Sequence, residues 1–218
     1  MSHPPDAADA ALLAALPPSL RLLAQRGEIK RFRKDQHLIE EGTHGDTLFV
    51  ILAGRLRAYS ADERGREIVY GIYGPGEYIG EMSLDGGPRS ASVAALEPAV
   101  CAVITRHTLH EHIAAHPPFA FELIARVIGR ARLATQSARD LALLDAYTRV
   151  ARLLESLAAP QPDGSALIAG RLTHAEIAAR VGCSREMVSR LLKDLERGRY
   201  LAAEGSGWRL ARSLPRRW

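Results

Sequence analysis

The 218-residue chain is long enough for one large domain or two ordinary ones, and its 47% apolar and 25% charged residues are typical of a globular protein. No apolar run is long enough to span a membrane, and the start lacks a secretion-signal pattern, so we expect a cytoplasmic protein. Residues 171–218 hold 11 Lys and Arg against 5 Asp and Glu, whereas residues 1–170 hold 18 against 20. A basic module on a mildly acidic body favours a polyanion that binds at one end.

The first part of the chain changes from helical to β-rich patterns. Residues 1–18 are expected to be an N-terminal extension, frayed over residues 1–10 and followed by short helices in "ALLAAL" and "SLRLLAQRG". Residues 19–117 form the next predicted domain, because short β-rich segments alternate there with glycine-bearing turns. This pattern predicts a sandwich or barrel. Cys101 and Cys183 are expected to be packing residues that form no disulfide.

Residues 118–144 are predicted to form one long helix. Apolar residues recur at alternating spacings of four and three, with charged flanks: Ala120, Ile124, Val127, Ala131, Ala134, Ala138 and Leu141. Such a narrow stripe favours pairing with a second copy of the chain, and packing on the β-domain is the alternative. Asp145 is a candidate N-cap for the next helix, which places a hinge near Leu144 and begins a last domain at residues 145–218.

The segment "RLTHAEIAARVGCSREMVSRLLKDLERGRYL" has the spacing of a helix-turn-helix. Thr173 and Glu176 match a capping box, Gly182 suits the tight turn, and Ser184 caps a second helix. "YLAAEGSGWRLARS" then predicts a hairpin wing. Caps, turn, apolar register and local basicity agree, so we interpret residues 145–218 as a winged helix-turn-helix that binds double-stranded DNA.

The exposed face of the second helix carries side chains that can read bases. Arginine donates to O6 and N7 of guanine, and glutamate accepts from the cytosine amino group, which suits Arg185, Glu186 and Arg190. Phosphate contacts are expected from Thr173, His174 and Lys193. The full set of predicted DNA-binding residues is Thr173, His174, Ser184, Arg185, Glu186, Ser189, Arg190 and Lys193.

The stretch "GEMSLDGGPRSASV", residues 80–93, combines glycines with Glu81, Arg89 and Ser90. Clustered backbone amides, a guanidinium and a hydroxyl suit a phosphate, whereas a carboxylate would repel phosphate and suits a ribose 2′-OH. The combination predicts a cyclic nucleotide. An internal Glu81–Arg89 ion pair that holds a turn is the alternative.

This stretch resembles the phosphate-binding cassette of cyclic-nucleotide-binding domains. Together with the β-rich core, the long helix and "GCSREMVSRLLKDLE", the chain from about residue 20 to 210 resembles the catabolite activator protein (CRP/FNR) family of bacterial regulators. The resemblance implies an α+β fold: a double-stranded β-helix (jelly-roll) sensor, a dimerising helix and a C-terminal winged helix-turn-helix. It also implies cyclic AMP as effector, with Glu81 at the ribose and Arg89 and Ser90 at the phosphate.

The candidate nucleotide site comprises Gly80, Glu81, Met82, Ser83, Arg89, Ser90, Ala91, Ala134 and Thr135. Two departures bear on the effector. The interval from Glu81 to Arg89 is shorter than in the cyclic-AMP receptor, and Ala134 replaces one of two hydroxyl residues that meet adenine in the family. Cyclic di-GMP, or no nucleotide effector, is therefore the alternative.

Other readings have less support. An iron–sulfur cluster lacks its cysteines, and a haem would need a ligand among His107, His110, His112 and His116, which are expected to be surface residues. A regulatory subunit acting through protein contacts would leave the basic C-terminal segment unexplained. No motif indicates an enzyme, a catalytic residue or a metal site. We expect a homodimer that binds a palindromic operator and contacts RNA polymerase, without membrane contact.

Overall fold

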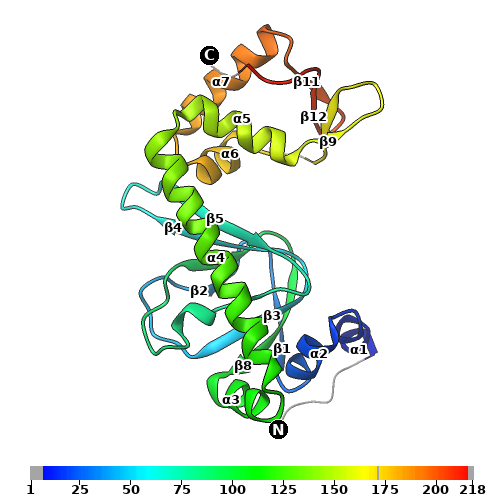
Figure 1. Ribbon diagram of the computed structural model, residues 1–218, viewed down its shortest axis with the longest axis vertical. Helices are drawn as coiled ribbons and strands as arrows, with labels where there is room; N and C mark the ends of the chain where they lie inside the picture. Colours follow the sequence, from blue (N-terminus) through cyan, green and yellow to red (C-terminus); the bar gives the residue numbers. More distant parts are fainter. Residues whose placement is uncertain (1–6, 171, 216–218) are drawn as a thin grey trace. The chain divides into compact units, whose positions relative to one another are not determined.

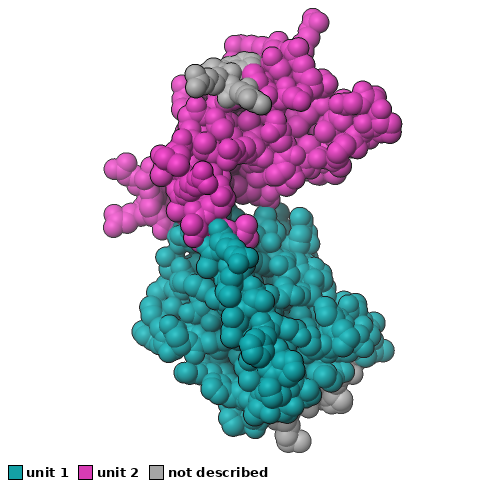
Figure 2. All heavy atoms as spheres, viewed as in Figure 1, with its two compact units in different colours: residues 1–60, 69–132 teal, residues 61–68, 133–218 magenta. Residues whose placement is uncertain are grey.

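The computed structural model describes residues 7–170 and 172–215, and Figure 1 labels most of the elements. The chain divides into two compact units (Figure 2): residues 1–60 with 69–132, and residues 61–68 with 133–218. The division falls inside the long helix α4 (Pro118–Leu143), after Arg132, whereas the predicted hinge lies at the end of that helix. The functional boundaries drawn from the sequence stay a prediction.

The first unit is built on two four-stranded sheets, with strand orders β1-β8-β3-β6 and β2-β7-β4-β5. The chain crosses repeatedly from one sheet to the other, as expected from the many short strands. The strands are β1 (Glu28–Phe32), β2 (His37–Ile39), β3 (Thr47–Ala53), β4 (Leu56–Ala61), β5 (Glu67–Tyr73), β6 (Tyr78–Ile79), β7 (Ser92–Ala95) and β8 (Ala99–Thr105).

Strand β3 shows how these sheets are buried. Its successive side chains point to opposite faces. Phe49 and Ile51 join the core between the two sheets, whereas Leu48, Val50 and Leu52 join a second core that includes helical residues. Because both faces of β3 are covered, its sequence, TLFVILA, is almost uninterruptedly apolar.

The N-terminal residues are more ordered than expected. Helix α1 (Ala7–Ala14) starts within the stretch predicted to be frayed, and that prediction is wrong for residues 7–10. Leu13 of this helix is buried in the second core, and Asp9 accepts a 2.7 Å hydrogen bond from Arg31 of β1. Apolar burial and an ion pair therefore hold α1. Residues 1–6 of the predicted extension lie outside the described residues.

Among the described residues, this unit has three further α-helices. They are α2 (Pro18–Ala24), α3 (Arg106–Ala115) and the first part of α4. Phe119 of α4 is buried in the second core, whereas Phe121, Ile124 and Ile128 are 76%, 52% and 45% exposed. One side of α4 thus packs on its own β-domain, and another side presents large apolar groups to solvent.

The second unit contains α5 (Ala146–Leu157), α6 (His174–Val181), α7 (Arg185–Arg197) and a four-stranded sheet of order β11-β12-β10-β9. Asp145 accepts a 2.7 Å hydrogen bond from the Thr148 amide, which confirms the predicted cap of α5. The wing strands β11 (Leu201–Glu204) and β12 (Gly207–Leu210) were predicted, but β9 (Ala159–Pro160) and β10 (Ala166–Ile168) were not. Strands of two or three residues carry too little alternation to be recognised.

Candidate functional site

Residues 80–93, here called the cassette, begin with a sharp turn at Gly80. This glycine has φ of 94°, and a Cβ there would lie 2.6 Å from the Thr47 carbonyl oxygen and 2.9 Å from Nη1 of Arg89. A 3₁₀ turn, Glu81–Ser83, follows. The Ser83 hydroxyl is hydrogen-bonded to the Gly45 carbonyl oxygen at 2.9 Å, and this bond ties the cassette to the loop before β3. Only glycine fits at position 80 without strain.

Arg89 is buried and turned toward backbone oxygens. It donates to the Gly80 carbonyl at 2.9 Å, the Thr47 carbonyl at 3.0 Å and the Thr47 hydroxyl at 2.9 Å. Burial lowers the pKa of Arg89, and the charges of Asp46 and Glu81 oppose that shift. In this conformation Arg89 holds the cassette to β3. These bonds occupy three of the five guanidinium N–H groups, so the predicted contact with a phosphate can use the other two or replace one of these bonds.

The Glu81 carboxylate lies in the protein interior, with its side chain 2% exposed. One oxygen, Oε1, pairs with Arg130 of α4, so the Glu81–Arg89 ion pair considered from the sequence is not the one that forms. The other oxygen, Oε2, is buried and has no hydrogen-bond partner among the described residues. A buried, unsatisfied carboxylate oxygen is costly, and a ligand hydroxyl could donate to it.

Arg130 is a residue that the sequence prediction missed. It also donates to the Tyr78 carbonyl oxygen, and its guanidinium lies 4.6 Å from the centre of the Tyr73 ring. It lies one helical turn before Ala134, and residues at this spacing are neighbours on one helix face. This spacing could have identified Arg130 as a candidate site residue from the sequence.

The remaining predicted nucleotide residues differ in exposure. Met82 is 54% exposed and Ser90 is exposed, whereas Ala91 is half-buried. Ala134 and Thr135 are exposed on α4, in the part of the helix that belongs to the second unit. Their contact with a nucleotide stays a prediction.

The caps of the helix-turn-helix form as predicted. Thr173 and Glu176 make a complete capping box, in which the Thr173 hydroxyl accepts from the Glu176 amide at 3.2 Å and donates to its carboxylate at 2.9 Å. Ser184 accepts from the Met187 amide at 3.1 Å. The Thr173 hydroxyl proton is therefore already engaged, whereas Ser184 keeps its hydroxyl proton for a phosphate.

The second helix of this motif, α7, separates an apolar face from a charged one. Val188, Leu191, Leu192 and Leu195 are buried in the core of the second unit. Ser189 is half-buried, and the large polar side chains are exposed: Arg185, Glu186, Arg190 and Lys193. This exposed face has the composition required to read base edges in a major groove.

Arg149 of α5 connects the end of α4, where the sequence predicts a hinge, to the turn of the helix-turn-helix; the sequence did not reveal this contact. It donates to the carbonyl oxygens of Leu144 at 2.6 Å, Val181 at 2.8 Å and Gly182 at 3.3 Å. Gly182 has φ of 65°, and a Cβ there would lie 2.8 Å from Cδ2 of Leu141. The turn, α5 and the end of α4 are therefore in contact within this unit.

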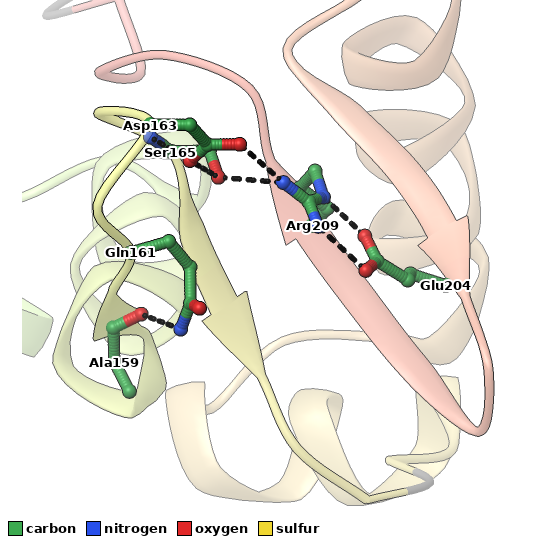
Figure 3. A network of polar contacts seen from close by, with 6 residues as sticks. All are labelled: Ala159, Gln161, Asp163, Ser165, Glu204 and Arg209. Carbon is green, nitrogen blue, oxygen red and sulfur yellow. Dashed lines mark hydrogen bonds and ion pairs between the residues drawn. The ribbon is translucent and has the colours of Figure 1, made fainter.

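A polar network braces the wing, as Figure 3 shows. Arg209 of β12 binds both carboxylate oxygens of Glu204 and donates to Asp163 at 2.8 Å and Ser165 at 2.9 Å. The hydrogen bonds to Arg209 hold the pKa of Glu204 below its usual range. The network joins the wing to the turn between β9 and β10.

A groove of about 790 Å³, here called the wing groove, separates the wing from the starts of α6 and α7. Its lining consists of Leu172, Thr173, His174, Ala175, Arg185, Gly205, Ser206, Gly207 and Trp208. Three residues of the predicted DNA-binding set thus share one groove, and none of its lining residues is acidic.

The histidines considered for a haem do not share one environment. His112 is 1% exposed, so its prediction as a surface residue is wrong; its ring stacks on His116 at 4.7 Å and meets Phe119 edge-on at 4.9 Å. Within residues 7–170 and 172–215, no group of three or more potential ligands is placed to hold a metal ion. No helix in those ranges is long and apolar enough to cross a bilayer.

Comparison with known proteins defines the class. A family model described as cyclic nucleotide-binding domain matches residues 29–116, and one described as Crp-like helix-turn-helix domain matches residues 148–212. The fold is therefore an α+β arrangement of a cyclic-nucleotide-binding β-roll, a long helix and a C-terminal helix-turn-helix, as the sequence predicted.

Similar whole proteins are transcription regulators. The chain is 32% identical over 193 residues to the cAMP-activated global transcriptional regulator CRP of Escherichia coli, covering 86% of this chain and 91% of that protein. It is 30% identical to the CRP-like cAMP-activated global transcriptional regulator of Mycobacterium tuberculosis, covering 87% and 86%. The structure of the c-di-GMP responsive global regulator CLP of Xanthomonas campestris is similar with a TM-score of 0.78, 25% identity and coverage of 88% and 97%.

The chain belongs to the CRP/FNR family and is a DNA-binding transcription regulator with a cyclic-nucleotide-binding domain. Its relatives are regulators rather than enzymes, in agreement with the sequence prediction.

Proposed function

We propose that this regulator is a homodimer whose affinity for a palindromic operator is controlled by a cyclic nucleotide, with cyclic AMP as the effector. The observation that carries the proposal is the buried Glu81 carboxylate, one oxygen of which lacks a partner among the described residues. A ribose 2′-OH is a donor of the required kind, and Arg89 provides positive charge for the phosphate.

The dimer is supported by the exposed apolar side of α4. Phe121, Ile124 and Ile128 would be paired with the same residues of a second copy, in a symmetric interface. Nucleotide contacts at Thr135 would then bias α4 and, through the hinge and Arg149, the separation of the two recognition helices. Only a separation of about 34 Å fits successive major grooves, and a coupling of about 1–3 kcal/mol is sufficient for a usable switch.

Cyclic di-GMP is the second candidate. Ala134 lacks the hydroxyl expected at an adenine contact, and CLP, which has a similar structure, is described as c-di-GMP responsive. Arg89 already donates to backbone carbonyls. Regulation without a nucleotide is therefore a third outcome that the test distinguishes.

Titration calorimetry with cyclic AMP, cyclic GMP and cyclic di-GMP, with and without operator DNA, tests the effector. Cyclic AMP is expected to bind wild type and to bind Glu81→Gln at least about tenfold more weakly, because the amide is a weaker acceptor for the 2′-OH than a carboxylate. If cyclic di-GMP binds and the other two nucleotides do not, cyclic AMP is refuted as the effector in favour of cyclic di-GMP. Absence of binding by all three would refute nucleotide control, and a monomer by sedimentation would refute the dimer.

Because the DNA partner of such a regulator is in the cytoplasm, we propose that compartment, and RNA polymerase as the protein partner on DNA. Pull-down of the polymerase by the operator-bound regulator tests the second point. Its absence from a complex assembled on a responsive promoter would contradict it.

A further inference from the structure

The wing groove contains an aromatic residue that the predicted DNA contacts do not include. Trp208 of β12 is half-buried, packs on the core of the second unit and lines the groove opposite the start of α6. We propose that Trp208 is a further DNA contact of this domain, its indole packing against a deoxyribose of the strand whose phosphates lie along the wing groove. The inference rests on the DNA-binding function of the helix-turn-helix.

Charge and polarity favour a sugar-phosphate strand as the occupant. The lining offers the guanidinium of Arg185, the imidazole of His174 and the hydroxyl of Ser206. Glu204, which precedes the wing turn, would repel a phosphate, but Arg209 binds both of its carboxylate oxygens. The negative charge of Glu204 is therefore compensated by Arg209. This pairing reduces the repulsion between the wing and polyanionic DNA.

The position of Trp208 is rigid. Its backbone pairs with Ala203 of β11 and Ile168 of β10, so it occupies a central strand of the wing sheet. An aromatic ring held on one edge by the core loses little conformational entropy when its other edge packs on a ligand. Contacts to the sugars and phosphates of DNA fix the position of a protein on the duplex without reading its sequence. A deoxyribose packed against Trp208 would have this positioning role.

Binding by full-length variants tests the proposal. The DNA is a duplex enriched from a random-sequence library by the wild-type protein. Trp208→Ala is expected to weaken binding about tenfold, roughly the 1.4 kcal/mol of a modest packing contact, while Trp208→Phe stays within about threefold. Because no charge is removed, the salt dependence of binding should keep its slope, whereas Lys193→Ala, at a predicted phosphate contact, should reduce the slope by about one.

Tyr200→Ala is the matched control, because Tyr200 packs on the same core but does not line the groove. It is expected to lower the melting temperature as Trp208→Ala does and to leave DNA affinity within about twofold. If Tyr200→Ala weakens DNA binding as much as Trp208→Ala does, core packing explains the effect and the proposal is overturned.

Fluorescence provides a readout that does not depend on the folding of an alanine variant. The chain has two tryptophans, so Trp218→Phe leaves Trp208 as the reporter. The enriched duplex is expected to protect Trp208 from acrylamide quenching by at least about twofold. Equal quenching with and without bound DNA would overturn the proposal, whereas failure of the wild type to bind any duplex would instead refute the DNA-binding function.

Discussion

The Glu81–Arg130 ion pair provides a quantitative test of the cassette structure. The Glu81 side chain is 2% exposed and that of Arg130 is 19% exposed, so the pair is largely shielded from water. Arg130→Met keeps most of the aliphatic packing but leaves a buried carboxylate without its cation. Removing one partner of a buried pair costs about 3–5 kcal/mol.

Part of that cost is separate from Glu81. Arg130 also donates to the Tyr78 carbonyl and lies over the Tyr73 ring. We assign about 1–2 kcal/mol to these two contacts together. The coupling between Glu81 and Arg130 should therefore be about 1–4 kcal/mol. The double variant Glu81→Gln/Arg130→Met should then be less destabilised than the sum of the single variants.

Denaturant unfolding of the four proteins at one pH measures this coupling. Arg126→Met is the matched control, since Arg126 lies on the same helix, 5.3 Å from the Tyr78 ring centre, and is exposed. It should cost less than about 1 kcal/mol. A loss below about 1 kcal/mol for Arg130→Met, or additive effects in the cycle, would refute the interpretation of Arg130 as the charge partner of Glu81.

Three further outcomes are expected. Burial, and then the charges of His116 and Arg26, lower the pKa of His112, so the neutral ring is favoured in the folded state. The contribution of His112 to the free energy of unfolding is therefore fully present above its unfolded pKa of about 6.5 and falls as the pH drops below that value. His112→Phe should flatten the dependence of urea unfolding on pH between about pH 7 and 5. A pH profile unchanged by that substitution would contradict this. Gly182→Ala should lower the free energy of unfolding by about 1–2 kcal/mol because of its left-handed backbone, and by a further amount because the added Cβ meets Leu141. Gly205→Ala, with φ of 57° and no heavy atom within 4 Å of the added Cβ, should show the backbone cost alone. Equal losses in the two variants would show that the contact with Leu141 costs nothing. In operator binding, Arg185→Ala should cost about 1–3 kcal/mol and relax specificity at one base pair, while Lys193→Ala should weaken all sequences alike, and selection from random DNA separates the two.

The sequence alone determined the features that depend on local chemistry. The caps at Asp145, Thr173 and Ser184 were predictable because a hydroxyl or carboxylate three residues before a free amide forms its bond within one turn. The apolar register of α7 was equally local. Residues 80–93 combined glycines, a carboxylate and a guanidinium densely enough to indicate a ligand site before any fold was known.

Only the tertiary structure decided which groups meet across long separations in the chain. Arg130 reaches Glu81 because α4 packs on the β-domain, and Arg89 turns toward the carbonyl of Thr47, 42 positions earlier. His112 is buried although its own helix is not strongly apolar, and Arg26, far earlier in the chain, lies close enough for its charge to lower the pKa of His112. Ion pairs and burial of this kind depend on how separate elements pack, and the spacing of residues along one segment carries no information about the side chains that another segment will bring.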